Sequence, residues 1–200
     1  MAESHAISRR AGVERPLWFR VFVSSLEGWT LGIIAGIGLI VLAESLGMRE
    51  MQTPLVAGVA LGVSAWQYRA LRPVLAGLGA RWIGVSCAGL SIPFVIADVA
   101  TLARRQMNYD LVILVLTGGA ITSILQWSML RTVVGRSDAW LVASPAGYLA
   151  VVSALWLNDG VLPRTVGVVG ALQYVAVILM GAALFGLFTG MAASRFEAQR

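Results

Sequence analysis

Polar side chains with hydrogen-bonding chemistry occur twice, in the same order, within otherwise apolar stretches of this sequence. Each group reads Gln-aromatic-x-x-Leu-Arg, then a short loop, then Trp-x-x-x-Ser-x-x-Gly. The groups supply an amide, a guanidinium, an indole and a hydroxyl at matching positions: Gln67, Arg72, Trp82 and Ser86 in the first, and Gln126, Arg131, Trp140 and Ser144 in the second. This match, with a single gap, indicates an internal duplication of a helical hairpin.

The spacing within each group predicts hydrogen bonds between helices. Each glutamine precedes its arginine by five residues, which places the amide about 7.5 Å deeper along a helix. An amide in lipid needs a partner, and a neighbouring helix is a ready source of one. We therefore expect Gln67 to bond to Ser86 and Gln126 to bond to Ser144, with the arginines at the water interface. The alternative is a ligand site built on the two glutamines.

A second set of polar residues lies toward the opposite interface. Asp98 stands about 24 Å along its helix from Trp82, and Glu44 has a similar depth. The acidic rim expected there also includes Glu50, Asp110 and Asp159. We expect a solvated surface partly neutralised by arginines; the alternative is a vestibule that attracts cations.

The arginines expected to neutralise this rim are Arg49, Arg104, Arg105 and Arg164. If the chain is a transporter, Asp98, Glu44 and Gln173 join the two repeat glutamines as the residues to test.

Several kinds of chemistry lack their residues. The only histidine is His5, in the polar tail, so paired-histidine haem sites and His-Glu-x-x-His zinc proteases are not encoded. Cys87 is the only cysteine, which excludes a disulfide within one chain. Serines in the apolar stretches have no nearby histidine or lysine to activate them. We expect no catalytic residues, no metal site and no enzyme activity.

Composition sets the fold class of the elements that must hold these groups. Hydrophobic residues make up 58% of the 200 and charged residues 12%, a balance that one soluble core of this size cannot bury. Apolar runs of about 20 residues, each able to cross a bilayer, recur along the chain. We predict an all-α polytopic membrane protein with six transmembrane helices, near 28–47, 54–71, 82–103, 110–130, 140–157 and 165–192.

The predicted domain organisation is a membrane domain between two short tails. Residues 1–27 form a tail whose stretch 16–22 is expected to lie along the membrane surface. Residues 28–192 form the six-helix domain, with hairpin repeats near 58–89 and 118–147, and residues 193–200 form a second tail. The helices that carry Gln67 and Gln126 run in the same direction, so the repeats are parallel rather than inverted.

The distribution of arginine predicts the orientation. All fifteen basic residues are arginine, a bias typical of a GC-rich bacterial genome. If the N-terminus is cytoplasmic, eleven arginines lie on the inner side and four on the outer side, so both termini are predicted in the cytoplasm and the location is the bacterial inner membrane. Trp18, Trp29, Trp82, Trp140 and Trp156 fall near predicted helix ends, where indoles commonly anchor a protein at the interface.

Small residues predict where the helices touch. Gly32 with Gly36, Gly58 with Gly62, and Gly186 with Gly190 are pairs four residues apart that allow close helix contact. The hairpin pattern of residues 58–147 resembles small bacterial multi-span membrane proteins that repeat a glycine-rich helix ending in Gln-Trp-x-x-Leu-Arg. That resemblance implies architecture only, since no activity is attached to the group.

Two functions fit these observations. The first is a non-catalytic accessory or structural subunit of a larger respiratory, photosynthetic or transport complex, because the loops are short and polar groups between helices are few. The alternative is a transporter of a small molecule or ion, or its substrate-binding membrane subunit. We expect no cofactor of its own, with contacts to lipid, pigment or quinone open, and other integral membrane subunits and lipids, not nucleic acid, as partners.

Overall fold

The computed structural model describes residues 15–49, 51–103, 110–162 and 167–197, and the regular elements of these residues are α-helices. The helices are α1 (Leu17–Ser45), α2 (Thr53–Leu71), α3 (Arg81–Leu102), α4 (Leu111–Val134), α5 (Asp138–Gly160) and α6 (Gly167–Glu197). Five of them are long and apolar enough to cross a membrane, and α2 is the exception. An all-α, multi-pass membrane architecture is thereby confirmed. The tail before residue 15 lies outside the described residues, and so do Glu50, Arg104, Arg105 and Arg164.

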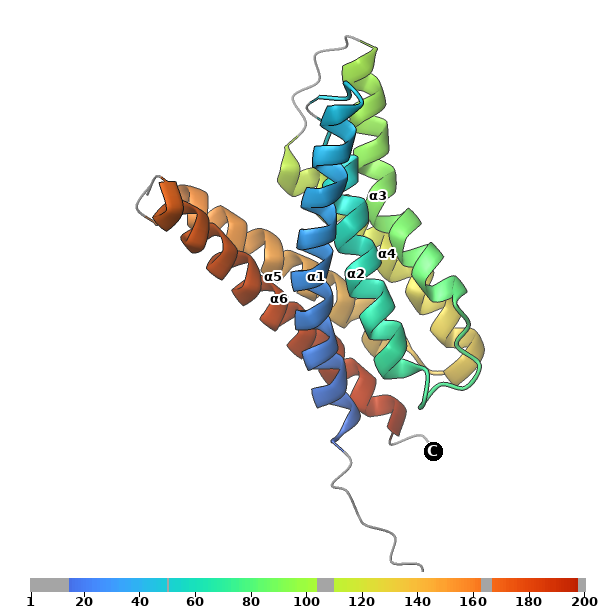
Figure 1. Cartoon of the computed structure of the whole chain (residues 1–200). Coiled ribbons are helices and arrows are strands. Elements are labelled where there is room, and N and C mark those ends of the chain that lie inside the picture. The colour runs from blue at the N-terminus through green and yellow to red at the C-terminus, as the bar shows by residue number, and fades with distance from the viewer. Residues whose placement is uncertain (1–14, 50, 104–109, 163–166, 198–200) are drawn as a thin grey trace, which may run out of the picture.

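The helices form a closed ring in chain order. Each packs mainly on its neighbours in sequence, and α6 returns to pack on α1. Helix α1 begins and α6 ends at the same end of the bundle, here called the terminal end (Figure 1). Helices α5 and α6 form an inclined hairpin that diverges from α1 toward the opposite end, here called the far end (Figure 1).

The first and last helices extend beyond their predicted limits, which corrects two expectations. Residues 16–22 do not form a separate surface segment, because α1 starts at Leu17 and runs for 29 residues. Leu17 and Val21 are fully buried against residues such as Phe196 of α6. The Leu17 backbone N–H also donates to Glu197 Oε1 at 3.0 Å, so most of the expected C-terminal tail is the last turn of α6.

Glycines set the contacts of α1, as their spacing predicts. A Cβ added at Gly58 would overlap the backbone of Gly36, and one at Gly62 would overlap the Gly28 carbonyl oxygen. On the other side of α1, a Cβ at Gly190 would lie 2.6 Å from the Trp18 carbonyl oxygen. Close helix contact at the three predicted glycine pairs is confirmed, with α1 held between α2 and α6.

Aromatic rings fill the core of the terminal end. The rings of Trp82 and Trp140 pack edge to face with centroids 5.5 Å apart, and Phe196 stacks on Trp140 at 6.2 Å. Both tryptophans are fully buried, and Trp29 is 7% exposed. The expectation of interface anchoring is therefore wrong for these three indoles, whose large apolar area is used in the core instead.

Trp18 and Trp156 differ from the three buried indoles. They are 40% and 65% exposed. Their exposure fits the predicted anchoring role of an indole at a membrane interface.

Candidate functional site

The amide of Gln126 is the centre of a buried polar network, but with a different partner from the predicted one. Its Nε2 donates to Ser86 Oγ at 2.8 Å, and its Oε1 accepts from Trp140 Nε1 at 2.9 Å. Ser86 in turn donates to the Trp82 carbonyl oxygen at 2.7 Å. The predicted bond to Ser144 is wrong because α4 packs on both α3 and α5, and the amide reaches back to α3.

The other predicted pair is also replaced. Gln67 Nε2 donates to Ser25 Oγ of α1 at 3.4 Å, so α2 is tied to α1 rather than to Ser86 of α3. Ser144 accepts from Ser123 Oγ at 2.8 Å instead of from Gln126. The polar residues of α4 therefore bond both to α5, within the second hairpin, and to α3 of the first hairpin, whereas Gln67 ties α2 to α1.

Matching positions in the two groups are bonded unequally. Trp140 donates to Gln126, whereas Trp82 Nε1 and Gln67 Oε1 are buried without a hydrogen-bond partner among the described residues. An unpaired buried polar atom costs about 1–3 kcal/mol of stability. The unpaired atoms of the first group therefore lower the stability of the fold, a cost that the bonded Trp140 of the second group avoids.

The two arginines of these groups lie at the terminal end. Arg72 and Arg131 are exposed, and the Arg131 guanidinium lies 5.3 Å from the centre of the Trp127 ring. Their positions agree with a water-facing end of the bundle.

Asp98 is not part of a solvated rim, which corrects that expectation. It is 5% exposed, its Oδ1 accepts from the Gln52 N–H at 3.1 Å, and its Oδ2 accepts from the Thr53 N–H at 2.8 Å. Helix α2 has no side-chain cap of its own, so a carboxylate from α3 satisfies its first N–H groups. Asp98 is a structural cap between two helices.

The other transport candidates lie apart from this cap, on α1 and α6. Glu44 is exposed on α1, and Gln173 on α6 is half-buried and donates to Asn158 Oδ1 at 3.2 Å. Asp110 and Asp159 are exposed at the far end, where Asp110 caps its own helix α4. The structure thus brings Gln126 and Ser86 together but places Asp98, Glu44 and Gln173 on three separate helices.

The candidate binding site is a central apolar cavity that the sequence did not predict. It has a volume of about 310 Å³, within the range of small-molecule pockets. All six helices line it, through residues that include Trp29, Val59, Phe94, Val115, Tyr148 and Ile178. No sequence signal distinguishes these side chains from lipid-facing ones, because both are apolar and recur at helical spacing.

Few polar atoms belong to this cavity. The hydroxyl of Tyr148 lies near Thr122. The Nε1 of Trp29 is buried and has no acceptor in the part of the chain that the structure describes. The cavity can therefore hold an apolar molecule.

The described part of the chain has no group of three His, Cys, Asp or Glu side chains that could hold a metal ion.

Comparisons of the sequence with known protein families and with curated proteins, and of the fold with solved structures, found no match.

Proposed function

We propose that this chain is a non-catalytic membrane protein that binds one apolar molecule, in the manner of a substrate-binding membrane subunit. The central cavity is the observation that carries the proposal. The cavity is partly open, with exposed lining residues such as Leu111 and Tyr174, so an apolar molecule of the membrane can enter it.

The chemistry of the cavity wall narrows the ligand class. The walls are almost wholly apolar, so a hydrophilic solute would lose its hydration without compensation. The lining therefore favours an apolar molecule, such as a lipid or a quinone, over a polar solute.

We also propose that all six helices cross the membrane. Helix α2 has 19 residues, about 28 Å, and lies against α1 along the glycine contacts, so it crosses with α1. Arg69, Arg72, Arg81 and Arg131 lie at the terminal end, which supports a cytoplasmic position for that end and the bacterial inner membrane as the location. Helices α2 and α4 run in the same direction, and this supports parallel hairpin repeats.

Mass spectrometry of small molecules that copurify with the full-length chain tests the proposed binding. The chain is purified from its native membranes in mild detergent, in the wild-type form and as Val115→Phe, which narrows the cavity. Ile113→Phe is the matched control, because Ile113 lies on the same helix and is 62% exposed.

We expect one apolar compound in the wild type and in Ile113→Phe, and its loss in Val115→Phe. Equal retention by Val115→Phe and the wild type would contradict the proposal. A wild-type chain that carries stoichiometric protein partners and no such compound would favour the structural-subunit function instead.

A further inference from the structure

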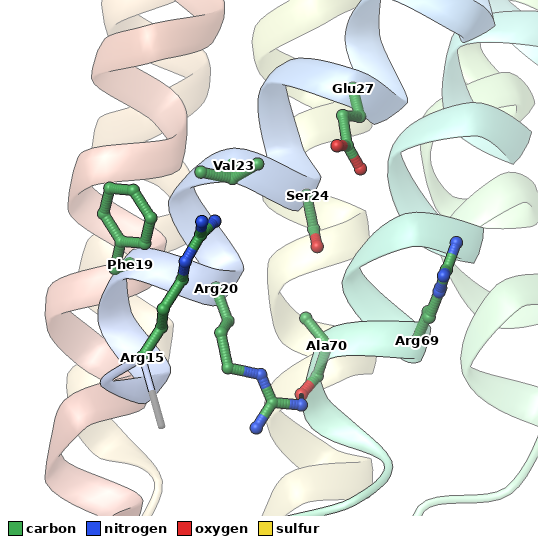
Figure 2. Close-up of a pocket in the computed structure, with 8 residues that line it drawn as sticks. All are labelled: Arg15, Phe19, Arg20, Val23, Ser24, Glu27, Arg69 and Ala70. Carbon is green, nitrogen blue, oxygen red and sulfur yellow. Dashed lines mark hydrogen bonds between the residues drawn. The ribbon is translucent and has the colours of Figure 1, made fainter. Parts of the chain in front are cut away.

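A second hollow, separate from the central cavity, opens between α1 and α2 at the terminal end. Its volume is about 260 Å³. Figure 2 shows Ser24 and Glu27 projecting from α1, and Arg69 standing on α2 across from them. Arg15 and Arg20 complete the polar wall. We call this site the arginine hollow; it shares no lining residue with the central cavity.

The three guanidinium groups are held differently. Arg20 Nη2 donates to the Ala70 carbonyl oxygen at 3.1 Å, which fixes its side chain across the gap between α1 and α2 (Figure 2). Arg15 lies over the Phe19 ring, 5.4 Å from its centre. Arg69 is exposed, and neither it nor Glu27 forms an ion pair or hydrogen bond within the described chain. Arg69 thus keeps its full donor capacity.

Charge and geometry together indicate an anion site. Three arginines against one carboxylate leave an excess of two positive charges in one hollow. A guanidinium presents paired N–H donors that match the oxygens of a phosphate group. Because Arg20 is already oriented by its bond to Ala70, less conformational entropy is lost when an anion binds.

We propose that the arginine hollow binds a phosphate group through Arg69 and Arg20, with Arg15 and the Ser24 hydroxyl as further donors. The phosphate belongs either to an anionic lipid headgroup or to a soluble phosphate compound. The hollow lies at the end of the bundle where α1 begins and α2 finishes, which is the level at which lipid phosphates meet a transmembrane helix.

The negative charge of Glu27 allows a second test of anion binding, because its removal should change the affinity in the opposite direction to the loss of an arginine. Glu27 stands seven residues beyond Arg20 on α1, about 10 Å along the helix axis, so it faces the inner part of the hollow. Its negative charge opposes a bound anion. Removal of that charge must therefore strengthen phosphate binding, whereas a merely solvated cluster of charges would show no such effect.

The experiment measures the thermal unfolding of the purified full-length chain in detergent with added ligands. One arm adds dioleoylphosphatidylglycerol, with dioleoylphosphatidylcholine as the zwitterionic comparison. The other arm adds inorganic phosphate, with chloride at equal ionic strength. The variants are Arg69→Gln, Arg69→Lys and Glu27→Gln, and Arg81→Gln is the control because Arg81 is exposed at the start of α3 and lines neither site.

We expect ligand-dependent stabilisation of the wild type, about tenfold weaker apparent affinity in Arg69→Gln, partial recovery in Arg69→Lys and tighter binding in Glu27→Gln. Arg81→Gln should remain within about twofold of the wild type. Stabilisation by phosphatidylglycerol alone identifies a lipid headgroup, and stabilisation by inorganic phosphate as well identifies a site for a phosphate group in general. Equal loss in Arg69→Gln and Arg81→Gln, or no stabilisation by either ligand, would overturn the proposal.

Discussion

Replacement of Trp140 and of Trp82 by phenylalanine tests the unequal bonding of the two matched groups. Both indoles are fully buried in the same core, so the loss of packing is similar in the two variants. Trp140→Phe also breaks the 2.9 Å bond to Gln126 and leaves Gln126 Oε1 without a donor, a loss of about 1 kcal/mol in a membrane protein. Trp82→Phe instead removes an unpaired N–H, which restores about 1 kcal/mol.

Trp140→Phe should therefore be less stable than Trp82→Phe by about 2 kcal/mol, roughly 30-fold in the unfolding equilibrium. The assay is far-UV circular dichroism of the full chain in mixed micelles titrated with dodecyl sulfate. A double-mutant cycle with Gln126→Leu should give a coupling energy of about 1 kcal/mol with Trp140, and the cycle of Gln67→Leu with Trp82→Phe should give none. If both cycles give the same coupling, or if Trp82→Phe is the less stable variant, the reasoning is refuted.

Two further substitutions should destabilise the fold in the same titration, each against a matched control. Asp98→Asn should cost about 1–2 kcal/mol because one buried N–H of α2 loses its acceptor, whereas Asp110→Asn at an exposed cap should cost less than about 0.5 kcal/mol. Gly58→Ala should cost about 2 kcal/mol or more because its Cβ overlaps Gly36, whereas Gly38→Ala, with nothing within 4 Å, should be neutral or stabilising. Equal effects within either pair would count against the contacts described.

Helix positions were predictable where hydropathy and turn residues agree. The stretch predicted as 54–71 is helical from Thr53 to Leu71, and the stretch predicted as 82–103 is helical from Arg81 to Leu102. The start of α1 was missed because a hydropathy window counts Arg20 and Glu27 as breaks. In the helix these two residues line the arginine hollow, while Leu17 and Val21 face the core. The direction of a side chain around the helix axis decided the outcome, and a window average does not contain it.

The polar network shows the same limit. Spacing along a helix gave the depth of Gln126 and Ser86 correctly, since the two residues meet. The spacing did not predict the hydrogen-bond partner of each glutamine, because the partner depends on which neighbouring helix the side chain faces. Glycine pairs were more informative, because a residue without a Cβ at helical spacing both marks the face and permits the close approach.

The ring arrangement of the helices explains why the cavity lies where it does. With each helix packed mainly on its chain neighbours, side chains alone must fill the centre. The rings of Trp82, Trp140 and Phe196 do so at the terminal end, whereas residues such as Val115 and Val59 leave about 310 Å³ open further along the bundle. Val115→Phe places a ring in this partly open cavity and should consequently weaken ligand binding, whereas Ile113→Phe on the exposed face of α4 should not. Equal binding by the two variants would show that the cavity is not the binding site.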